Sequence, residues 1–352
     1  MNRSMKGIAI VAAAMVTVGI LLTVIGYMAG GNQHIYFDKM GIHVGNSDGG
    51  KNGGGDLVLF SQDVDSFSSI NVDLDYYDVD FVPSDKFAVD GEYLSGEGEP
   101  VIQVENDTLV VKNIGHKILN IDFDLSDLIF DENHQPNIKI YYPKNTKLKD
   151  VVIHCDSSDL DLADLTVENA EFGLDFGKLE LTNITADNIT VDMDSGDCTM
   201  KKMKAANKLT VTNDFGKTTL DGAEMKTLKV EADSGDVILT DTTFDSGDLN
   251  LNFGKLTAEG MTSNGLKVEA DSGDVNLEGM LAGITDVTCD MGKVTINPGA
   301  ARDQFNFELD ADMGTVSIEG DRKSGSVSSE NPSAKNTLKI TTDMGDINVN
   351  FE

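Results

Sequence analysis

Two nearly identical stretches, LKVEADSGDVIL at Leu228–Leu239 and LKVEADSGDVNL at Leu266–Leu277, decide the fold of this chain. They begin 38 residues apart, and a variant, LNLNFGKLTA at Leu249–Ala258, lies between them. The repeating unit is therefore about 19 residues long. A repeat of this length predicts a stack of small structural units, each in contact mainly with its neighbours.

A glycine marks the same place in each unit, with Ser158 in the first one. The column is Ser158, Gly177, Gly196, Gly216, Gly235, Gly254, Gly273, Gly292, Gly314 and Gly345. Successive members are 19 or 20 residues apart until the last two steps, which are 22 and 31. We expect the units to stack in this order. We also expect the polar segment Asp321–Asn336, within the longest step, to be a loop.

Apolar and polar residues alternate on both sides of the column. In one unit Val230 stands five residues before the glycine, and Val237 and Leu239 stand two and four after it. This period of two predicts two short strands per unit, each with one buried face. Residues 151–352 are therefore expected to form an all-β, parallel β-solenoid, a β-helix-like stack of 19–20-residue rungs that share one core.

The residues next to the glycine alternate from unit to unit. Directly after it Lys178 is followed by Asp197 and then Lys217, while directly before it phenylalanine alternates with serine. If rungs stack in register about 4.8 Å apart, each lysine lies between two aspartates, whereas a column of like charges would repel itself. This alternation favours a parallel solenoid over an antiparallel sandwich.

An apolar segment near the start predicts a membrane anchor. Residues 1–6 form a basic head, and the run Gly7–Met28 holds no charge, which gives roughly 33 Å of helix. We expect a transmembrane helix over residues 7–29, with the head cytoplasmic and the rest outside the membrane. A cleaved signal peptide is the competing interpretation, but this run is longer than a normal signal core and lacks small residues at both cleavage positions.

Two further segments precede the repeats. Residues 30–56 include the tract GNSDGGKNGGGD and are expected to form a flexible Gly-rich tether. Residues 57–150 alternate less regularly and are expected to form an irregular N-terminal β region or the first rungs. Within them, Val101–Asn113 is typical of a hairpin with its turn at Asn106-Asp107.

Charge excludes one class of partner. The net charge of -33 would repel nucleic-acid phosphates, so nucleic acid is not expected as a partner. The charge fits a solvated surface that resists self-association, and gathering of divalent cations is the alternative. An aspartate column two residues before the glycine, which includes Asp175 and Asp233, raises the same choice: calcium ligands, or the favoured interpretation, Asx turns that close each bend.

No candidate catalytic, cofactor-binding or metal-binding residue emerges. Cys155, Cys198 and Cys289 have no metal-site spacing and fall at inward positions, so we expect them to be buried and free. His154 adjoins Cys155, but neighbours on a strand point to opposite faces, which separates this nucleophile–base pair. Solenoid enzymes that act on acidic polysaccharides use basic residues, and the arginines of the repeat region are only Arg302 and Arg322.

The repeated turn also resembles a known family. DSGDV-type turns at Asp233–Val237, Asp271–Val275 and Asp343–Ile347, with the less regular β segment and one N-terminal helix, resemble a bacterial family of unknown function called putative adhesins. The resemblance covers Leu57–Glu352. It implies a β-solenoid at the cell envelope, links some relatives to envelope-stress systems, and supplies no catalytic residues.

These observations predict a non-enzymatic, single-pass protein of the cell membrane. Its repeat domain is expected to act outside the membrane as an adhesin or binding scaffold. Expected partners are membrane lipid, through the N-terminal helix, and cell-wall polymer, a host surface or another membrane protein. The alternatives are a polysaccharide-processing β-helix enzyme and an envelope-stress signalling partner of other membrane proteins.

Overall fold

The computed structural model of the chain describes residues 35–38, 41–44, 57–95, 98–113, 136–144 and 146–352. The expected cytoplasmic head, transmembrane helix and most of the tether lie outside these residues. No helix in the described ranges is long and apolar enough to cross a membrane. Strands β1 (Ile35–Asp38) and β2 (Gly41–Val44) pair antiparallel, and they belong to a separate unit from the solenoid.

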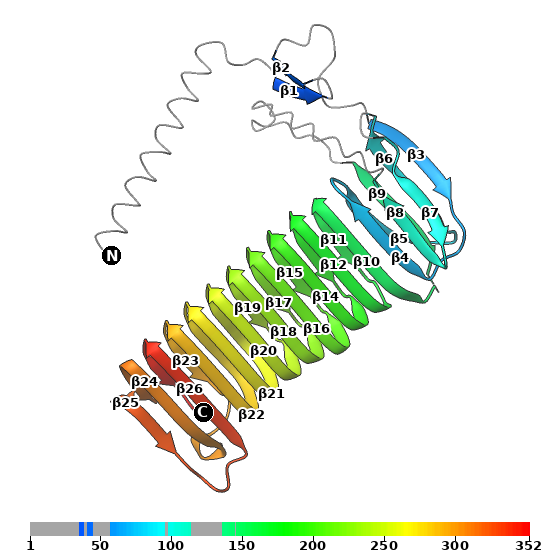
Figure 1. The fold of residues 1–352 in the computed structure, drawn as a ribbon. Coiled ribbons are helices and arrows are strands. Elements are labelled where there is room, and N and C mark those ends of the chain that lie inside the picture. Colours follow the sequence, from blue (N-terminus) through cyan, green and yellow to red (C-terminus); the bar gives the residue numbers. More distant parts are fainter. Residues whose placement is uncertain (1–34, 39–40, 45–56, 96–97, 114–135, 145) are drawn as a thin grey trace. The chain divides into compact units, whose positions relative to one another are not determined.

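The repeats form a parallel β-solenoid in which each rung has one long and one short strand (Figure 1). The long strands are β10 (Leu148–Ser157), β12 (Val167–Phe176), β14 (Thr185–Ser195), β16 (Lys204–Phe215), β18 (Glu224–Ser234) and β20 (Thr243–Phe253). The short strands are β11 (Leu160–Ala163), β13 (Leu179–Thr182), β15 (Cys198–Lys201), β17 (Thr218–Asp221) and β19 (Val237–Thr240). The strands β21 (Leu256–Ser272) and β22 (Val275–Met291) each join a short strand to the next long one, and β23 (Val294–Asn297) is short.

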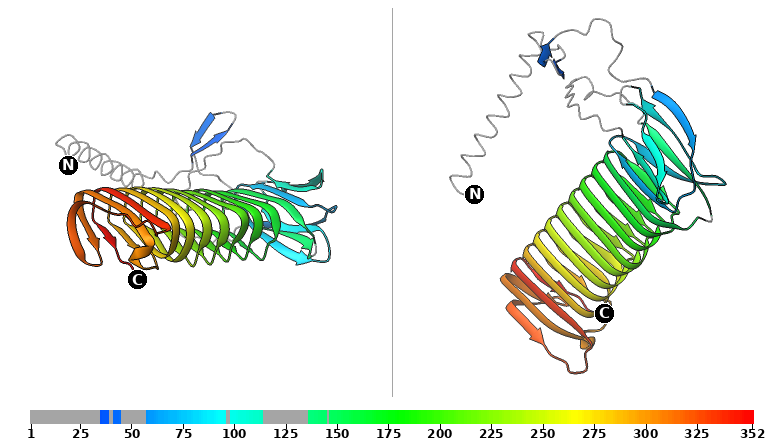
Figure 2. Two further views of the ribbon diagram at one scale, coloured as in Figure 1. Left: turned by 90° about the horizontal axis from the view of Figure 1, so that it is seen from below. Right: turned by 45° about the vertical axis from the view of Figure 1, so that its right-hand side comes forward.

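Successive rungs pair in register, as the repeat predicts (Figure 2). Phe172 lies beside Val191, and Val191 beside Val211, at steps of 19 and 20 residues. The extra residue of the longer step is taken up by a register shift between Ala205 and Lys208. Inward positions such as Val191 are fully buried, so the core is one continuous apolar column shared by all rungs.

The first turn of each rung needs glycine because neighbouring backbones approach closely there. Gly196 has φ +140°, and a Cβ on it would lie 1.7 Å from the carbonyl oxygen of Gly177 in the preceding rung. No side chain fits at that distance. The glycine column is therefore a consequence of stacking, and its prediction as the turn of each rung is confirmed.

The last rungs stack out of sequence order, which corrects the expected order. Strand β26 (Asn336–Met344) lies between β22 and β24 (Phe305–Ile318), and β27 (Ile347–Val349) lies between β23 and β24 (Figure 1). The C-terminal segment thus completes the penultimate rung, and β24 forms the last one. Every rung carries the same period-two pattern, so the pattern cannot distinguish one order from the other.

The expected loop Asp321–Asn336 is also corrected. Its first part is strand β25 (Asp321–Ser329), which pairs antiparallel with β24 and covers the end of the stack. The connection into β24 holds a short 3₁₀ helix at Arg302–Gln304. An antiparallel strand with charged and serine side chains ends the parallel stack and discourages further pairing.

The region before the repeats contributes rungs and a second cap. Strand β4 (Ser69–Leu74) lies between β8 (Thr108–Lys112) and β10, so again the order differs from the sequence. The strands β7 (Val101–Glu105) and β8 form the expected hairpin, with Asn106 and Asp107 at φ 51° and 67°. A separate sheet holds β3 (Leu57–Asp63), β6 (Ala88–Leu94), β9 (Asn137–Pro143) and β5 (Asp78–Ser84).

Candidate binding surface

The stacked first turns form one edge of the solenoid, here called the turn edge. It consists of the glycine column with the two residues before it and the one after it in each rung. Aspartates after the glycine accept hydrogen bonds across rungs: the Lys217 backbone N–H donates to Asp197 Oδ1 at 2.9 Å, and that of Lys255 to Asp236 Oδ1 at 2.9 Å. The Lys178–Asp159, Lys293–Asp274 and Thr315–Asp346 pairs repeat this bond at 2.8–2.9 Å.

This bond changes the meaning of the lysine–aspartate alternation. The expected partner of each aspartate was a lysine ammonium group, but the carboxylate binds the lysine's backbone N–H. Among the described ion pairs, the ammonium group of Lys178 contacts Glu180 in its own rung. The alternation therefore satisfies a turn N–H in every second rung, and it confirms in-register stacking for a different physical reason.

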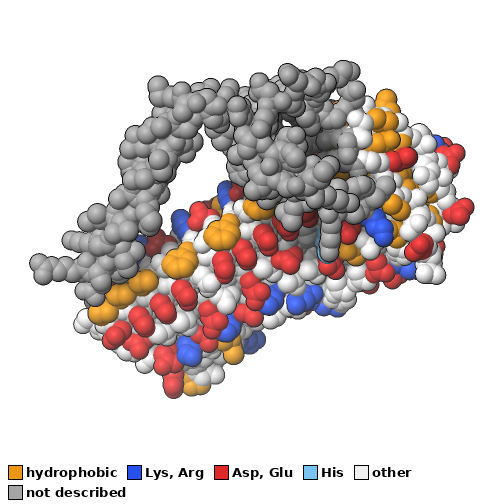
Figure 3. Space-filling model, turned by 45° about the horizontal axis from the view of Figure 1, so that its top comes forward, with side chains coloured by type: hydrophobic (Ala, Val, Ile, Leu, Met, Phe, Trp, Pro, Cys, Tyr) orange, Lys and Arg blue, Asp and Glu red, His pale blue; other side chains and the backbone are white. Residues whose placement is uncertain are grey.

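Six large apolar side chains stand exposed along the turn edge, directly before the glycines. We call them the apolar row: Phe176 (59 % exposed), Phe215 (58 %), Phe253 (59 %), Met291 (46 %), Met344 (46 %) and Met313 (65 %). Serines 195, 234 and 272 occupy the same position in the intervening rungs, next to these phenylalanines. Figure 3 shows hydrophobic side chains in a row along the solenoid, with acidic side chains beside it.

An unbroken polar row flanks the apolar row, two residues before the glycines. We call it the carboxylate row: Asp156, Asp175, Asp194, Asp214, Asp233, Asn252, Asp271, Asp290, Asp343 and Asp312. No carboxylate of this row accepts a hydrogen bond from its own turn among the described contacts, so the Asx-turn prediction is not confirmed. Partial burial, and then the charges of Asp233, Asp194 and Asp192, raise the pKa of Asp214.

The carboxylate row is a line of repelling charges. At its N-terminal end, partial burial and the neighbouring Asp75 and Asp175 raise the pKa of Asp156 in the same way. Over the residues that the structure describes, no three His, Cys, Asp or Glu side chains converge in a way that could hold a metal ion. A cation brought by a partner would relieve this repulsion.

The cysteines lie in the core, as expected. Cys155, Cys198 and Cys289 are buried and free. Burial raises the pKa of Cys155 and Cys289 to about 11 and that of Cys198 to about 12, so all three are thiols at neutral pH. His154 points outward, with its Nε2 3.3 Å from Glu171 Oε1, so the structure keeps it apart from the buried Cys155.

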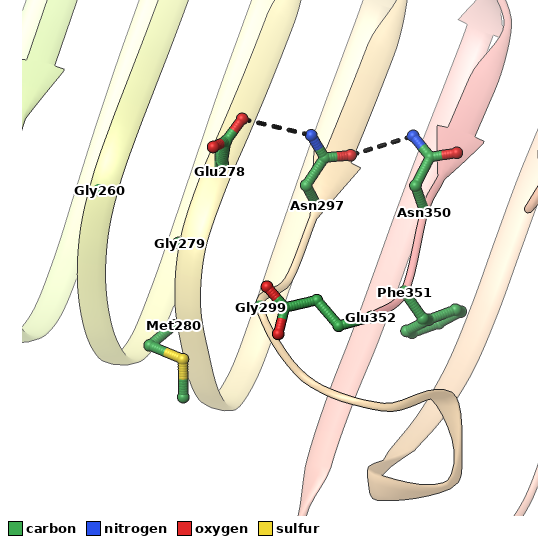
Figure 4. Close-up of a pocket in the computed structure, with 9 residues that line it drawn as sticks. All are labelled: Gly260, Glu278, Gly279, Met280, Asn297, Gly299, Asn350, Phe351 and Glu352. Carbon is green, nitrogen blue, oxygen red and sulfur yellow. Dashed lines mark hydrogen bonds between the residues drawn. The ribbon is translucent and has the colours of Figure 1, made fainter.

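A shallow pocket of about 570 Å³ lies near the C-terminus, beside the second turns of the last rungs (Figure 4). Its lining is Gly260, Glu278, Gly279, Met280, Asn297, Gly299, Asn350, Phe351 and Glu352. Asn350 donates to Asn297 at 3.0 Å, and Asn297 donates to Glu278 at 3.4 Å. These hydrogen bonds join adjacent rungs. Among the residues that line the pocket, no nucleophilic side chain lies next to a base.

The phenylalanine–serine alternation predicts stacking, but that prediction did not include the exposure of these phenylalanines to solvent. A signal was present. A column that accepts both phenylalanine and serine cannot be a close-packed core position, because a core position would need a constant volume. The turn glycine ends the strict alternation of the strand, so the residue before it leaves the core even though Leu174, two residues before Phe176, is buried.

Similar solved structures include a putative lipid binding protein from Parabacteroides distasonis, at 12% identity over 86% of this chain and 98% of that one, with a TM-score of 0.42. Putative adhesins from the same species (12%; 84% and 97%; TM-score 0.41) and from Bacteroides fragilis (14%; 84% and 97%; 0.33) are also similar. No curated protein matches the chain. The model of one family matches residues 67–350, and the chain therefore belongs to the Toastrack DUF4097 family.

Proposed function

We propose that this chain is a non-enzymatic binding scaffold of the cell envelope that presents its turn edge to a partner. Residues 7–29 anchor it in the membrane, and the solenoid lies outside. The observation that carries the proposal is the apolar row. Six large apolar side chains are exposed at one structural position, although the serines at the same position show that the fold does not require them. Exposed apolar groups that gather along one edge, rather than being scattered singly, mark interaction sites on soluble surfaces.

A rigid scaffold suits this role. Backbone pairing joins each rung to the next, and an aspartate bond at the turn reinforces every second junction, so the stack sets the spacing of the apolar row. A partner that binds several members therefore meets a preorganised surface and orders few protein side chains on binding. Catalysis receives no comparable support, because the thiols are held protonated and His154 is paired with a carboxylate on the outer face.

The test compares the full-length protein with the triple variant F176S, F215S and F253S. Each protein, purified in an uncharged detergent, is sedimented with isolated cell envelopes. We expect the wild type to co-sediment and the variant to remain mostly in solution. The matched control is L59S, M280S and I284S, which removes exposed apolar side chains elsewhere. Equal binding by all three proteins would rule out the apolar row as the binding surface.

Two further measurements test whether the solenoid lies outside the membrane and whether the protein is an enzyme. Protease added to intact cells should degrade the solenoid if it lies outside the membrane, and protection of the solenoid would contradict the proposed location. Incubation of the full-length protein with cell-wall and acidic glycans should release no reducing or unsaturated ends. Release of such ends would establish the polysaccharide-processing alternative.

A further inference from the structure

Four of the six side chains of the apolar row are regularly spaced along the stack. Phe176, Phe215, Phe253 and Met291 occupy every second rung, and each is separated from the next by one rung. At a strand spacing of about 4.8 Å, their period is about 9.6 Å, and the four span about 29 Å. Serines 195, 234 and 272 lie in register between these large side chains and are much shorter. We call the position over each of these serines, between two large side chains, a notch.

This period matches one backbone conformation. A polyproline II helix repeats every three residues at about 3.1 Å per residue, or about 9.3 Å per turn, so three turns cover about 28 Å. An α-helix repeats its face every seven residues at about 10.5 Å, or about 31.5 Å over three repeats, and drifts out of step. In a β-strand, residue i+3 points to the opposite face from residue i. One side chain per polyproline II turn can therefore enter each notch.

The flanking charges specify the chemistry of the partner. On one side of the apolar row, the carboxylate row has an acid in every rung except at Asn252. On the other side, lysines and aspartates alternate, as at Lys217 and Asp236, and nearly cancel. The protein's net charge of -33 also disfavours anionic partners and a second copy of this chain. A partner that carries cations along one side and little net charge along the other therefore fits both flanks.

We propose that the turn edge binds a cationic, proline-rich segment in the polyproline II conformation. One residue of each turn, best a proline, sits in the notch over a serine such as Ser195 or Ser234, between the large side chains of the adjacent rungs. A lysine or arginine of each turn reaches the carboxylate row. This inference rests on the proposed scaffold function and assigns the chemical class of its partner. Aromatic-lined surfaces bind such segments well because their extended conformation is already ordered before binding.

The experiment measures peptide binding to the full-length protein in an uncharged detergent by fluorescence anisotropy. The probe is a labelled 15-residue peptide of five Pro-Pro-Lys repeats. A peptide of five Gly-Gly-Lys repeats has the same charge without the fixed conformation, and five Pro-Pro-Glu repeats have the conformation with the opposite charge. We expect the first peptide to bind at least about tenfold more tightly than the second, and the third not to bind. Equal binding of the two lysine peptides would overturn the proposal.

Variants place the site. The triple variant F176S, F215S and F253S should weaken binding of the Pro-Pro-Lys peptide at least about tenfold, as should D175N, D214N and D233N. The matched controls are L59S, M280S and I284S for the apolar change, and E168Q, D187N and E259Q for the charge. The controls should bind like the wild type. If a control lost as much peptide binding as the corresponding turn-edge variant, the turn edge would be refuted as the binding site.

A direct readout does not depend on those variants folding. The chain has no tryptophan, so F215W introduces a single exposed fluorophore on the apolar row, and I284W introduces one elsewhere. The Pro-Pro-Lys peptide should shift the F215W emission to shorter wavelength and leave I284W unchanged. An unchanged F215W emission at saturating peptide would contradict the proposal.

Other occupants of the turn edge have their own outcomes. Binding of vesicles of phosphatidylcholine with phosphatidylglycerol that is lost in the apolar triple variant would show a membrane surface instead. A dimer in sedimentation that is lost in the same variant would show a second copy. Envelope binding through the apolar row without peptide binding would refute the peptide class and leave the scaffold function standing. If the wild type bound neither the envelopes nor the peptide, both the scaffold function and the peptide class would be refuted.

Discussion

Single residues at the second turn of each rung adopt a backbone conformation with positive φ. Asp164, Asn183 and Asp241 have φ values of 57°, 56° and 47° at this position, and Gly222 has 64°. These residue types tolerate the left-handed region, because a short polar side chain or a hydrogen avoids the clash that other residues suffer. Lys202 is the exception, at φ 54°. Its side chain is exposed, so nothing else in the rung requires a lysine.

The substitution Lys202→Asn should therefore stabilise the protein by about 0.5–1 kcal/mol. Asparagine adopts this conformation with less strain, as Asn183 does one rung earlier. The measurement is the midpoint of urea unfolding. Lys226→Asn, at an exposed position within β18, removes the same charge and serves as the control. A gain no larger than the control's would show that relief of strain is not the cause.

Burial of the Cys198 thiol predicts a dependence of stability on alkaline pH. Its pKa is raised to about 12 in the fold, against 9.0 for the unperturbed group. The unfolded chain therefore loses this proton first as pH rises. The stability that the neutral thiol contributes is complete below pH 9 and declines from there towards pH 12.

We expect the unfolding temperature of the wild type to fall more steeply between pH 9 and 11 than that of Cys198→Ala. The variant starts less stable, because it loses buried volume, but it lacks this ionisation. Thermal unfolding followed by circular dichroism measures both slopes. Parallel slopes would mean that other groups control alkaline unfolding.

At the scale of the element, the first turn owes its order to a bond between rungs. Asp236 Oδ1 accepts a hydrogen bond from the backbone N–H of Lys255 at 2.9 Å. Asp214 belongs to the carboxylate row of the previous rung, and the charges that raise its pKa are those of other aspartates. Two aspartates in neighbouring rungs therefore have opposite effects on the fold. One satisfies a turn, and the other raises the repulsion along the edge.

Substitution of the first should cost stability and substitution of the second should not. We expect Asp236→Ala to destabilise the protein by about 1 kcal/mol through the lost acceptor, and Asp214→Ala to be neutral or stabilising at neutral pH. Urea unfolding of both variants measures the difference. Equal losses would mean that both carboxylates act through general charge.

At the scale of the whole molecule, the stack repeats every two rungs rather than every one. Rungs with aspartate after the glycine alternate with rungs that carry lysine there, and each aspartate serves the lysine rung that follows it. Residues 228–234 and 266–272 are both LKVEADS, so removing residues 235–272 joins Ser234 to Gly273 within an unchanged local sequence. Removing residues 235–253 instead places two lysine rungs in contact.

We expect the deletion of residues 235–272 to fold and to shorten the solenoid by about 9.6 Å, because nearest neighbours hold the stack together. The deletion of residues 235–253, although smaller, should be the less stable of the two, since Lys255 loses its acceptor and faces Lys217. Thermal unfolding and small-angle X-ray scattering measure stability and length. Global unfolding of the longer deletion would argue against independent rungs.

Much of the fold and little of the candidate surface could be predicted from residues. Val230, Val237 and Gly235 gave the inward positions and the turn, because strand alternation and steric exclusion act locally. Phe215 was predicted to stack in register, and it does. Its exposure depends on how the chain turns at Gly216, which alternation along one strand does not describe. The apolar row is therefore visible only after the rungs are assembled.

The sequence by itself determined the rung, its register and the burial of the three cysteines, because a repeated pattern constrains every copy alike. The tertiary structure decided the order of the rungs at both ends. There β26 enters between β22 and β24, and β4 enters between β8 and β10. Rungs with the same apolar pattern can pair with one another in any order. Contacts between residues far apart in the chain select one order, such as the bond from the Thr315 N–H to Asp346 and the antiparallel pairing of β25 with β24.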